Sequence, residues 1–112
     1  MTKLLEPPEG RQVFTRAFTA LPEHIDANGH VNNVVYLDWV QQIAIAHWEA
    51  VQPADDQAKW AWICLRHEVD YRRALMPGET AQARTWLSET TEGPRYDRYV
   101  RIDGPDGAMC AQ

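Results

Sequence analysis

Three side chains that can move protons or orient water stand at alternate positions of one short segment: Asp26, Asn28 and His30. A carboxylate can take a proton from water or attack a carbonyl carbon itself. The segment leads into an apolar stretch, 32–51, and the first turn of a helix has unpaired N–H groups that can stabilise an oxyanion. This combination suits the hydrolysis of an acyl thioester, which passes through a tetrahedral oxyanion.

The same residues also have a plainer interpretation, which their spacing leaves open. Asn28-Gly29 is a common turn pair, and Asp26 could bind amide groups of its own loop. His30 could be a packed core histidine. Taken one at a time, these residues are weak signals of catalysis.

The element that must position them is a helix expected over 32–51. Its polar side chains fall within a stripe about 100° wide, and nearly all other positions are apolar. The stripe consists of Asp38, Gln41, Gln42 and Glu49. A helix with this pattern has to be surrounded by other elements. His47 lies opposite the stripe and is predicted to be a hydrogen-bonded buried histidine.

A two-residue periodicity predicts strands in the rest of the chain. They are expected over 13–20, 63–72, 80–88 and 96–102, with a last strand beginning near Ala108. The later connections are too short for parallel crossovers, so the strands should form an antiparallel meander. The predicted class is α+β, a single domain over 1–112 with an antiparallel sheet wrapped around one long central helix. The last strand is short and is expected to be clipped or ragged.

Composition excludes several classes of protein. The 112 residues contain 11 Lys and Arg against 16 Asp and Glu, a formal net charge of −5, which argues against nucleic acid as a partner. No apolar run is long enough for a membrane span. The polar N-terminus lacks the features of a signal peptide, so a cytoplasmic location is expected. The four His and two Cys have no metal-ligand spacing, and Cys64 is predicted to have a core or sheet-face role.

Residues 24–39, HIDANGHVNNVVYLDW, closely resemble the signature of the hotdog-fold thioesterases related to 4-hydroxybenzoyl-CoA thioesterase. They are more similar still to the Asp-x-Asn-x-His-Val-Asn-Asn pattern of plant-type acyl-carrier-protein thioesterases. The matching positions are Asp26, Asn28, His30, Val31, Asn32 and Asn33. The run 69–73 and the turn 77–79 resemble the family's strand–turn–strand. Gln42 departs from the pattern, because many relatives have an acidic residue there.

The resemblance implies hydrolysis of an acyl-CoA or acyl-ACP thioester in fatty acid metabolism, without a cofactor. Asp26 would be the general base or nucleophile, Asn28 and His30 would align the thioester or water, and the N–H near Asn33 would meet the thioester oxygen. The predicted substrate contacts are Gly29, Val31, Asn32, Tyr36, Arg72 and Arg73. The two arginines are candidates for a phosphate group. The family also implies a homodimer or a dimer of dimers (a homotetramer), with each site between subunits.

Two other functions stay open at this point. The chain could be a non-catalytic acyl-binding hotdog module, or a hydratase or dehydratase of the same fold. Acyl length, aromatic or aliphatic preference, and CoA or carrier protein as the thiol depend on the depth of a tunnel that the sequence does not define.

Overall fold

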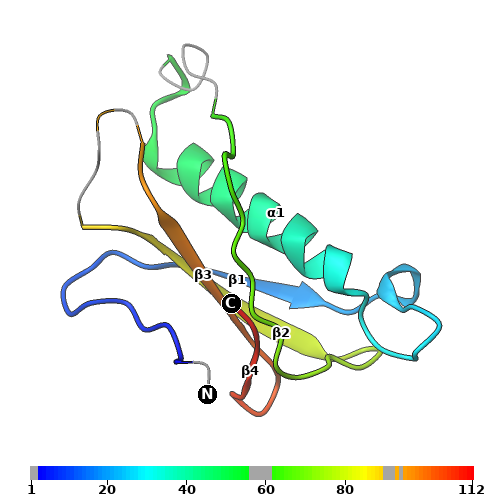
Figure 1. Ribbon diagram of the computed structural model, residues 1–112. Helices are drawn as coiled ribbons and strands as arrows, with labels where there is room; N and C mark the ends of the chain where they lie inside the picture. Colours follow the sequence, from blue (N-terminus) through cyan, green and yellow to red (C-terminus); the bar gives the residue numbers. More distant parts are fainter. Residues whose placement is uncertain (1–2, 56–61, 90–92, 94) are drawn as a thin grey trace.

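The computed structural model of the protein describes residues 3–55, 62–89, 93 and 95–112. One long helix lies across one face of a single antiparallel sheet (Figure 1). In chain order the elements are β1 (Phe14–Thr19), the short 3-10 helix η1 (Pro22–His24), α1 (Asn33–Val51), β2 (Thr80–Leu87), β3 (Arg98–Asp103) and β4 (Met109–Ala111). The strands are neighbours in the order β1-β2-β3-β4. The α+β class and the antiparallel order are therefore confirmed. No helix in this described part is long and apolar enough to span a membrane.

The helix and four of the predicted strands begin and end within about two residues of their expected bounds. Asn32 is the N-cap of α1 and not its first residue, since its side chain accepts the amide N–H of Val34. At alternate positions of β2, Ala81, Ala83 and Thr85 are buried. The local periodicity of the sequence thus predicts these elements well.

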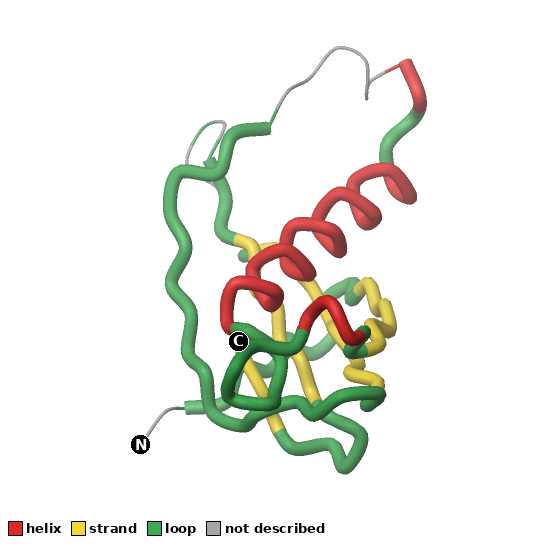
Figure 2. Tube along the Cα trace, turned by 90° about the vertical axis from the view of Figure 1, so that its right-hand side faces the viewer, coloured by secondary structure: helices red, strands yellow, loops and turns green. Residues whose placement is uncertain are grey.

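The strand predicted over 63–72 is wrong for most of its length. Asp70 and Gln112 exchange two backbone hydrogen bonds, of 2.9 and 3.0 Å, and the Arg72 amide donates to Cys110 at 2.8 Å. Residues 62–69 lie beyond this short ladder and have no neighbouring strand in the described structure. Figure 2 shows them within a long run that carries no strand colour. The backbone N–H and C=O groups of a strand need hydrogen-bond partners on a neighbouring strand. The two-residue periodicity of this segment was therefore not sufficient to make it a strand.

One face of α1 forms the core with the sheet. Its buried residues are Tyr36, Trp39, Ile43 and His47, which recur every three or four positions as the geometry of a helix requires. Trp39 stacks on Phe18 of β1 with ring centroids 5.2 Å apart. Burying side chains such as Trp39 and Ile43 stabilises the fold by roughly 1.5–3 kcal/mol each. This contact fixes the position of the helix on the sheet.

The opposite side of α1 remains open in the single chain. Most of the polar stripe is exposed as expected, but so are Val34 and Ile45, at 68% and 51%. The sheet therefore covers one face of α1, whereas the apolar sequence of this helix requires cover on most of its sides. Apolar helix surface is left for another element or another subunit.

The N-terminal arm, residues 3–12, contacts the outer face of the sheet at Arg101 of β3, through Leu5 and Glu6. Arg101 alternates with core residues of β3 and is itself buried, 7% exposed. Its guanidinium donates to the Leu5 carbonyl at 3.2 Å, contacts the Glu6 carboxylate and binds Asp103 at 2.8 Å. The Gln112 side chain accepts the Leu5 amide N–H at 2.9 Å. Charged and polar contacts thus hold the arm to the sheet.

His47 is the hydrogen-bonded buried histidine that the sequence predicts. It is 6% exposed, and its ring stacks on Phe14 at 5.2 Å. Arg98 donates to its Nδ1 atom at 2.9 Å and to Thr85 Oγ1 at 3.0 Å. Burial, and then the charge of Arg98, lower the pKa of His47. Both effects keep the imidazole neutral.

This lowered pKa predicts a loss of stability in mild acid. The unfolded histidine has a pKa of about 6.5, above that of the folded one, so the unfolded chain binds more protons between the two values. The free energy of unfolding should fall as the pH decreases below about 6.5, by up to about 1.4 kcal/mol per pH unit. Urea unfolding of the His47→Gln variant between pH 7 and pH 5 should show a shallower dependence. His67→Gln, at an exposed position, should keep the wild-type slope; equal slopes in all three proteins would contradict the prediction.

Candidate active site

The segment 25–31 forms a small hairpin whose ends are joined by an antiparallel bridge. The Asp26 amide donates to the His30 carbonyl, and the Gly29 amide to the Asp26 carbonyl, both at 3.0 Å. Gly29 has a φ of +82°, which glycine adopts without the strain that a side chain would cause. The Asn-Gly pair therefore serves the turn, and the turn brings Asp26 and His30 opposite each other.

Within this hairpin the three candidate side chains are close in sequence but are not bonded to one another. Asp26 Oδ1 accepts the Asn28 amide N–H at 2.9 Å, so the plainer interpretation of Asp26 as a loop anchor is correct for one oxygen. The nearest polar partner of His30 Nδ1 is the Val31 carbonyl, at 3.4 Å. In the described part of the chain, the second oxygen of Asp26 has no hydrogen bond.

The start of α1 has one free amide next to the hairpin. A helix leaves the N–H groups of its N-cap and first three residues without an intrahelical partner. Asn32 donates to the His24 carbonyl at 3.0 Å, Val34 to the Asn32 side chain at 3.0 Å, and Val35 to the Asn32 carbonyl at 2.9 Å. Among the described residues only the N–H of Asn33 in this turn has no acceptor. It is at the position where the family resemblance expects an N–H that meets the thioester oxygen.

Leu75 joins the hairpin to the helix. Its carbonyl accepts the Val31 amide N–H at 2.9 Å, and its own amide donates to the Tyr36 hydroxyl at 3.2 Å. The Leu75 and Tyr36 side chains are buried, and burial raises the pKa of Tyr36 to about 12. Tyr36 is therefore a neutral phenol inside the protein, where it ties the helix to the chain beside the hairpin. Its predicted role as a substrate contact has no support from this buried position.

Two further residues hold the site, and residue patterns alone did not point to them. The Tyr71 hydroxyl donates to the Asn33 carbonyl at 3.2 Å. His24 Nδ1 accepts the Leu21 amide N–H at 3.0 Å, and the His24 ring meets Trp39 edge-on at 5.5 Å. Both residues lie within the stretches that resemble the thioesterase family. This resemblance was the only feature of the sequence that could have indicated them. They fix the chain on either side of the Asn33 amide.

The comparison with known families agrees with this geometry. Residues 20–112 match the thioesterase-like superfamily. The chain belongs to this superfamily. No curated protein matches the sequence significantly. The match includes the hairpin, the helix and all strands after it.

Several solved structures share the fold of this chain. A predicted thioesterase from Bacillus stearothermophilus has a TM-score of 0.75 and 24% identity, over 89% of this chain and 74% of that one. A thioesterase from Thermus thermophilus, complexed with coenzyme A and Zn, has a TM-score of 0.76 and 22% identity, over 91% and 78%. An acyl-ACP thioesterase from Bacteroides thetaiotaomicron has 0.75 and 21%, over 88% of this chain but 42% of that one. The hotdog fold is thereby confirmed.

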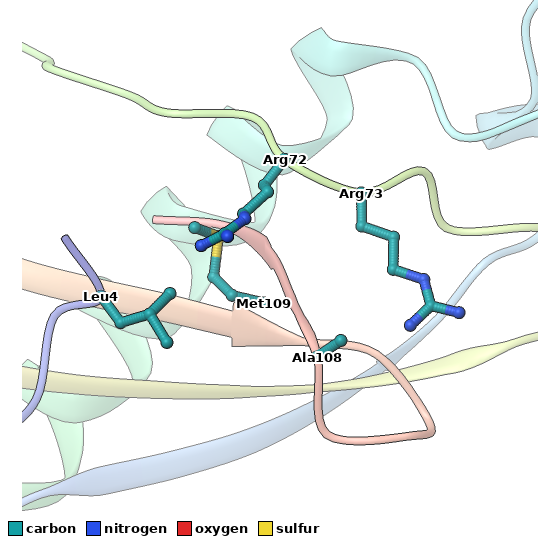
Figure 3. A pocket seen from close by; sticks show the side chains of 5 residues that line it. All are labelled: Leu4, Arg72, Arg73, Ala108 and Met109. Atoms are coloured by element: carbon teal, nitrogen blue, oxygen red, sulfur yellow. The ribbon is translucent and has the colours of Figure 1, made fainter. Parts of the chain in front are cut away.

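The remaining predicted substrate contacts of this thioesterase-like protein do not lie together in one place. Val31 is 1% exposed and packs in the core, and Asn32 caps the helix. Arg72 and Arg73 line a separate hollow on the outer side of β4, together with Leu4, Ala108 and Met109 (Figure 3). None of the candidate catalytic residues lines that hollow.

The cysteines are not part of the hairpin site. Cys110 is buried, and burial raises the pKa of its thiol, which disfavours the reactive thiolate. Cys64 is exposed, with its sulfur 3.4 Å from His67 Nε2, so the predicted core or sheet-face role of Cys64 is wrong. It lies in the segment that has no strand partner among the described residues. These residues also contain no group of three or more His, Cys, Asp or Glu side chains that could hold a metal ion.

The hydrogen bond between Leu75 and Tyr36 predicts that substitutions of two tyrosines reduce stability by different amounts. Tyr36→Phe leaves the buried Leu75 amide without an acceptor, which should reduce the free energy of unfolding by about 1–3 kcal/mol. Tyr71→Phe removes a hydroxyl from an exposed residue and should cost less than about 0.5 kcal/mol. Chemical denaturation of both variants measures the difference. If the two variants are equally stable, the Tyr36 hydrogen bond does not hold this joint.

Proposed function

We propose that this protein hydrolyses an acyl-CoA or acyl-ACP thioester to a carboxylic acid and a thiol. The observation that carries the proposal is the position of the Asp26 carboxylate on a hairpin that runs directly into the free Asn33 amide. A hydrolytic site needs a base or nucleophile and an oxyanion donor that act on the same carbonyl group, and a short connection between Asp26 and Asn33 favours this. Membership of the thioesterase-like superfamily supports the same reaction.

In the proposed mechanism Asp26 acts as general base or nucleophile. The Asn28 amide holds one carboxylate oxygen at 2.9 Å, which orients the other toward water or the carbonyl carbon. The Asn33 N–H stabilises the oxyanion, and the loss of one such donor typically costs about 2.7–4 kcal/mol of transition-state stabilisation. Asn28 and His30 align water or the thioester. The proposed substrate contacts are Gly29, Asn32, Arg72 and Arg73.

We further propose a compartment and two possible thiol carriers. Cys64 and Cys110 are both free thiols, as is usual in a reducing compartment, which supports a cytoplasmic location. The family resemblance is the basis for a role in fatty acid metabolism. A solved relative is complexed with coenzyme A, and another is an acyl-ACP thioesterase. Either carrier presents the same thioester to Asp26.

We also propose that the protein works as a homodimer or a dimer of dimers, with the site completed at the junction. The segment 62–70 exposes Ile63 and Leu65, at 81% and 70%, and its backbone is largely unpaired within the described structure. An exposed apolar edge of this kind is a template for another strand. Pairing with the same segment of a second copy would cover it and would bring the partner near Tyr71 and the Asn33 amide.

Substitution of Asp26 tests the reaction. Asp26→Ala should reduce turnover by on the order of 10²–10⁴-fold, because the base or nucleophile is lost. Asp26→Asn keeps an oxygen for the Asn28 amide and removes only the charge, so it should fold normally and be similarly impaired. Release of thiol from a panel of acyl-CoA chain lengths, followed with a thiol-reactive dye, measures both.

The control is Asp38→Asn, an exposed carboxylate on the helix that accepts the Gln42 amide at 2.7 Å; it should retain wild-type turnover. Full activity of Asp26→Asn would remove this carboxylate from the mechanism. Binding of acyl-CoA without thiol release would indicate a binding module. Loss of enoyl-CoA absorbance would indicate a hydratase.

Charge at the exposed edge tests the assembly. The double substitution Ile63→Lys and Leu65→Lys should convert the dimer to a monomer, because like charges would face each other across the new ladder. Analytical ultracentrifugation measures the change. Thr15→Lys adds a lysine to β1, the opposite edge of the sheet, and should leave the dimer intact. A monomeric wild-type protein at micromolar concentration would refute the assembly.

A further inference from the structure

A histidine closes η1, the short turn that precedes the hairpin. The His24 amide donates to the Leu21 carbonyl at 2.9 Å, and His24 Nδ1 accepts the Leu21 amide N–H at 3.0 Å. In a capping box, the residue three positions after the N-cap is usually a Glu or Gln whose side chain accepts the N-cap amide. In η1 the imidazole of His24 has this role, so a rigid ring closes the turn.

This hydrogen bond defines the protonation of the His24 ring. A backbone N–H can only donate, so Nδ1 of His24 must offer a lone pair and carry no proton. The neutral ring then has its proton on Nε2. Neither nitrogen is a free base in this arrangement, because Nδ1 is occupied by Leu21 and Nε2 is protonated. His24 can therefore hold neighbouring groups in place, but it cannot take a proton from water.

The His24 ring also connects the turn to the core. It meets the Trp39 ring edge-on, with centroids 5.5 Å apart and an interplanar angle of 89°, a favourable arrangement for two aromatic rings. Trp39 is buried and stacks on Phe18 of β1. Through one ring, His24 contacts both η1 and the buried face of α1.

The His24 carbonyl reaches the start of α1. It accepts the amide N–H of Asn32, the N-cap, at 3.0 Å. Asn32 in turn accepts the amides of Val34 and Val35, with its side chain and its carbonyl. These bonds fix the peptide group between Asn32 and Asn33, which carries the free Asn33 N–H. The closed turn and this peptide group therefore meet at His24.

We propose that His24 is a positioning residue for the Asn33 amide and acts through the hydrogen bond that Nδ1 accepts from Leu21. The proposal rests on the proposed function and deepens it, since it names what holds the oxyanion donor in place. Without the Nδ1 acceptor the turn can open, the His24 carbonyl shifts, and the Asn32 amide loses its partner. A misplacement of about 1 Å at a reacting centre can cost on the order of 10²-fold in rate.

Two substitutions separate the acceptor from the ring. Asn carries Oδ1 at the same number of bonds from Cα as Nδ1 of His, so His24→Asn keeps an acceptor for Leu21 and loses the contact with Trp39. His24→Phe keeps an aromatic ring beside Trp39 and loses the acceptor. The Leu21 amide bond is at the surface, where water can replace the acceptor, so both variants should fold.

Turnover of an acyl-CoA should follow the acceptor and not the ring. His24→Phe should lower kcat by about 10–10²-fold and leave KM within about twofold, because an oxyanion donor acts mainly in the transition state. His24→Asn should keep kcat within about threefold of the wild type. Glu23→Gln, a change at an exposed neighbour in the same turn, should retain the wild-type kcat and serves as the control.

The thermal stability of the two variants should have the reverse order. His24→Asn should melt at a lower temperature than His24→Phe, because it loses the ring contact with Trp39. A merely structural role of His24 would make turnover follow stability, with His24→Asn the more impaired variant. That order, or an equal kcat in both variants and the wild type, would overturn the proposal.

Amide hydrogen exchange separates this proposal from the proposed function. The amides of Leu21 and Asn32 should exchange at least about tenfold faster in His24→Phe than in the wild type and in His24→Asn. This pattern in a protein that hydrolyses no thioester would support the hold of His24 on the start of the helix and refute only the reaction. Equal exchange in the three proteins would refute the role of His24, whether or not the protein is active.

Discussion

The structure depends on a helix that is apolar on most sides but is covered by the sheet on one. Tyr36, Trp39, Ile43 and His47 are buried against it, and this burial is the main favourable term that fixes the axis of α1. Because the axis is fixed, the first turn of the helix is held at one end of the core. The hairpin before it then has a defined neighbour, and Asp26 is held on the segment that leads into the Asn33 amide.

Leu75 connects the helix to the hairpin that carries the candidate site. Its two backbone groups bind the Tyr36 hydroxyl and the Val31 amide, so the helix, the hairpin and the chain after residue 71 meet at one buried point. Buried hydrogen bonds of this kind resist distortion, because a broken one leaves an unsatisfied group. The exposed edge segment 62–70 is continuous with this point through Tyr71. The proposed dimer contact and the proposed reaction would therefore involve the same few residues.

The two faces of the sheet are built on different interactions. The inner face packs apolar side chains, and Arg98 bonds there to neutral His47 and Thr85. The outer face is organised by charge, with Arg101 between Glu6 and Asp103 under the N-terminal arm. Within the described part of the chain Arg72 has no ion pair, whereas the neighbouring Arg73 pairs with Asp106.

The sequence by itself determined the elements whose signals are local. The helix, four strands and the turn at Asn28-Gly29 follow from periodicity and from the needs of the backbone, and the hairpin motif places Asp26, Asn28 and His30 in one short loop. Only the tertiary structure decided which groups have partners. Leu75 meets Tyr36, and Asp106 meets Arg73, across more than thirty residues, and no local pattern encodes such distances. The segment 62–69 has the periodicity of a strand, but a strand also requires a neighbour, and the neighbour is a property of the whole fold.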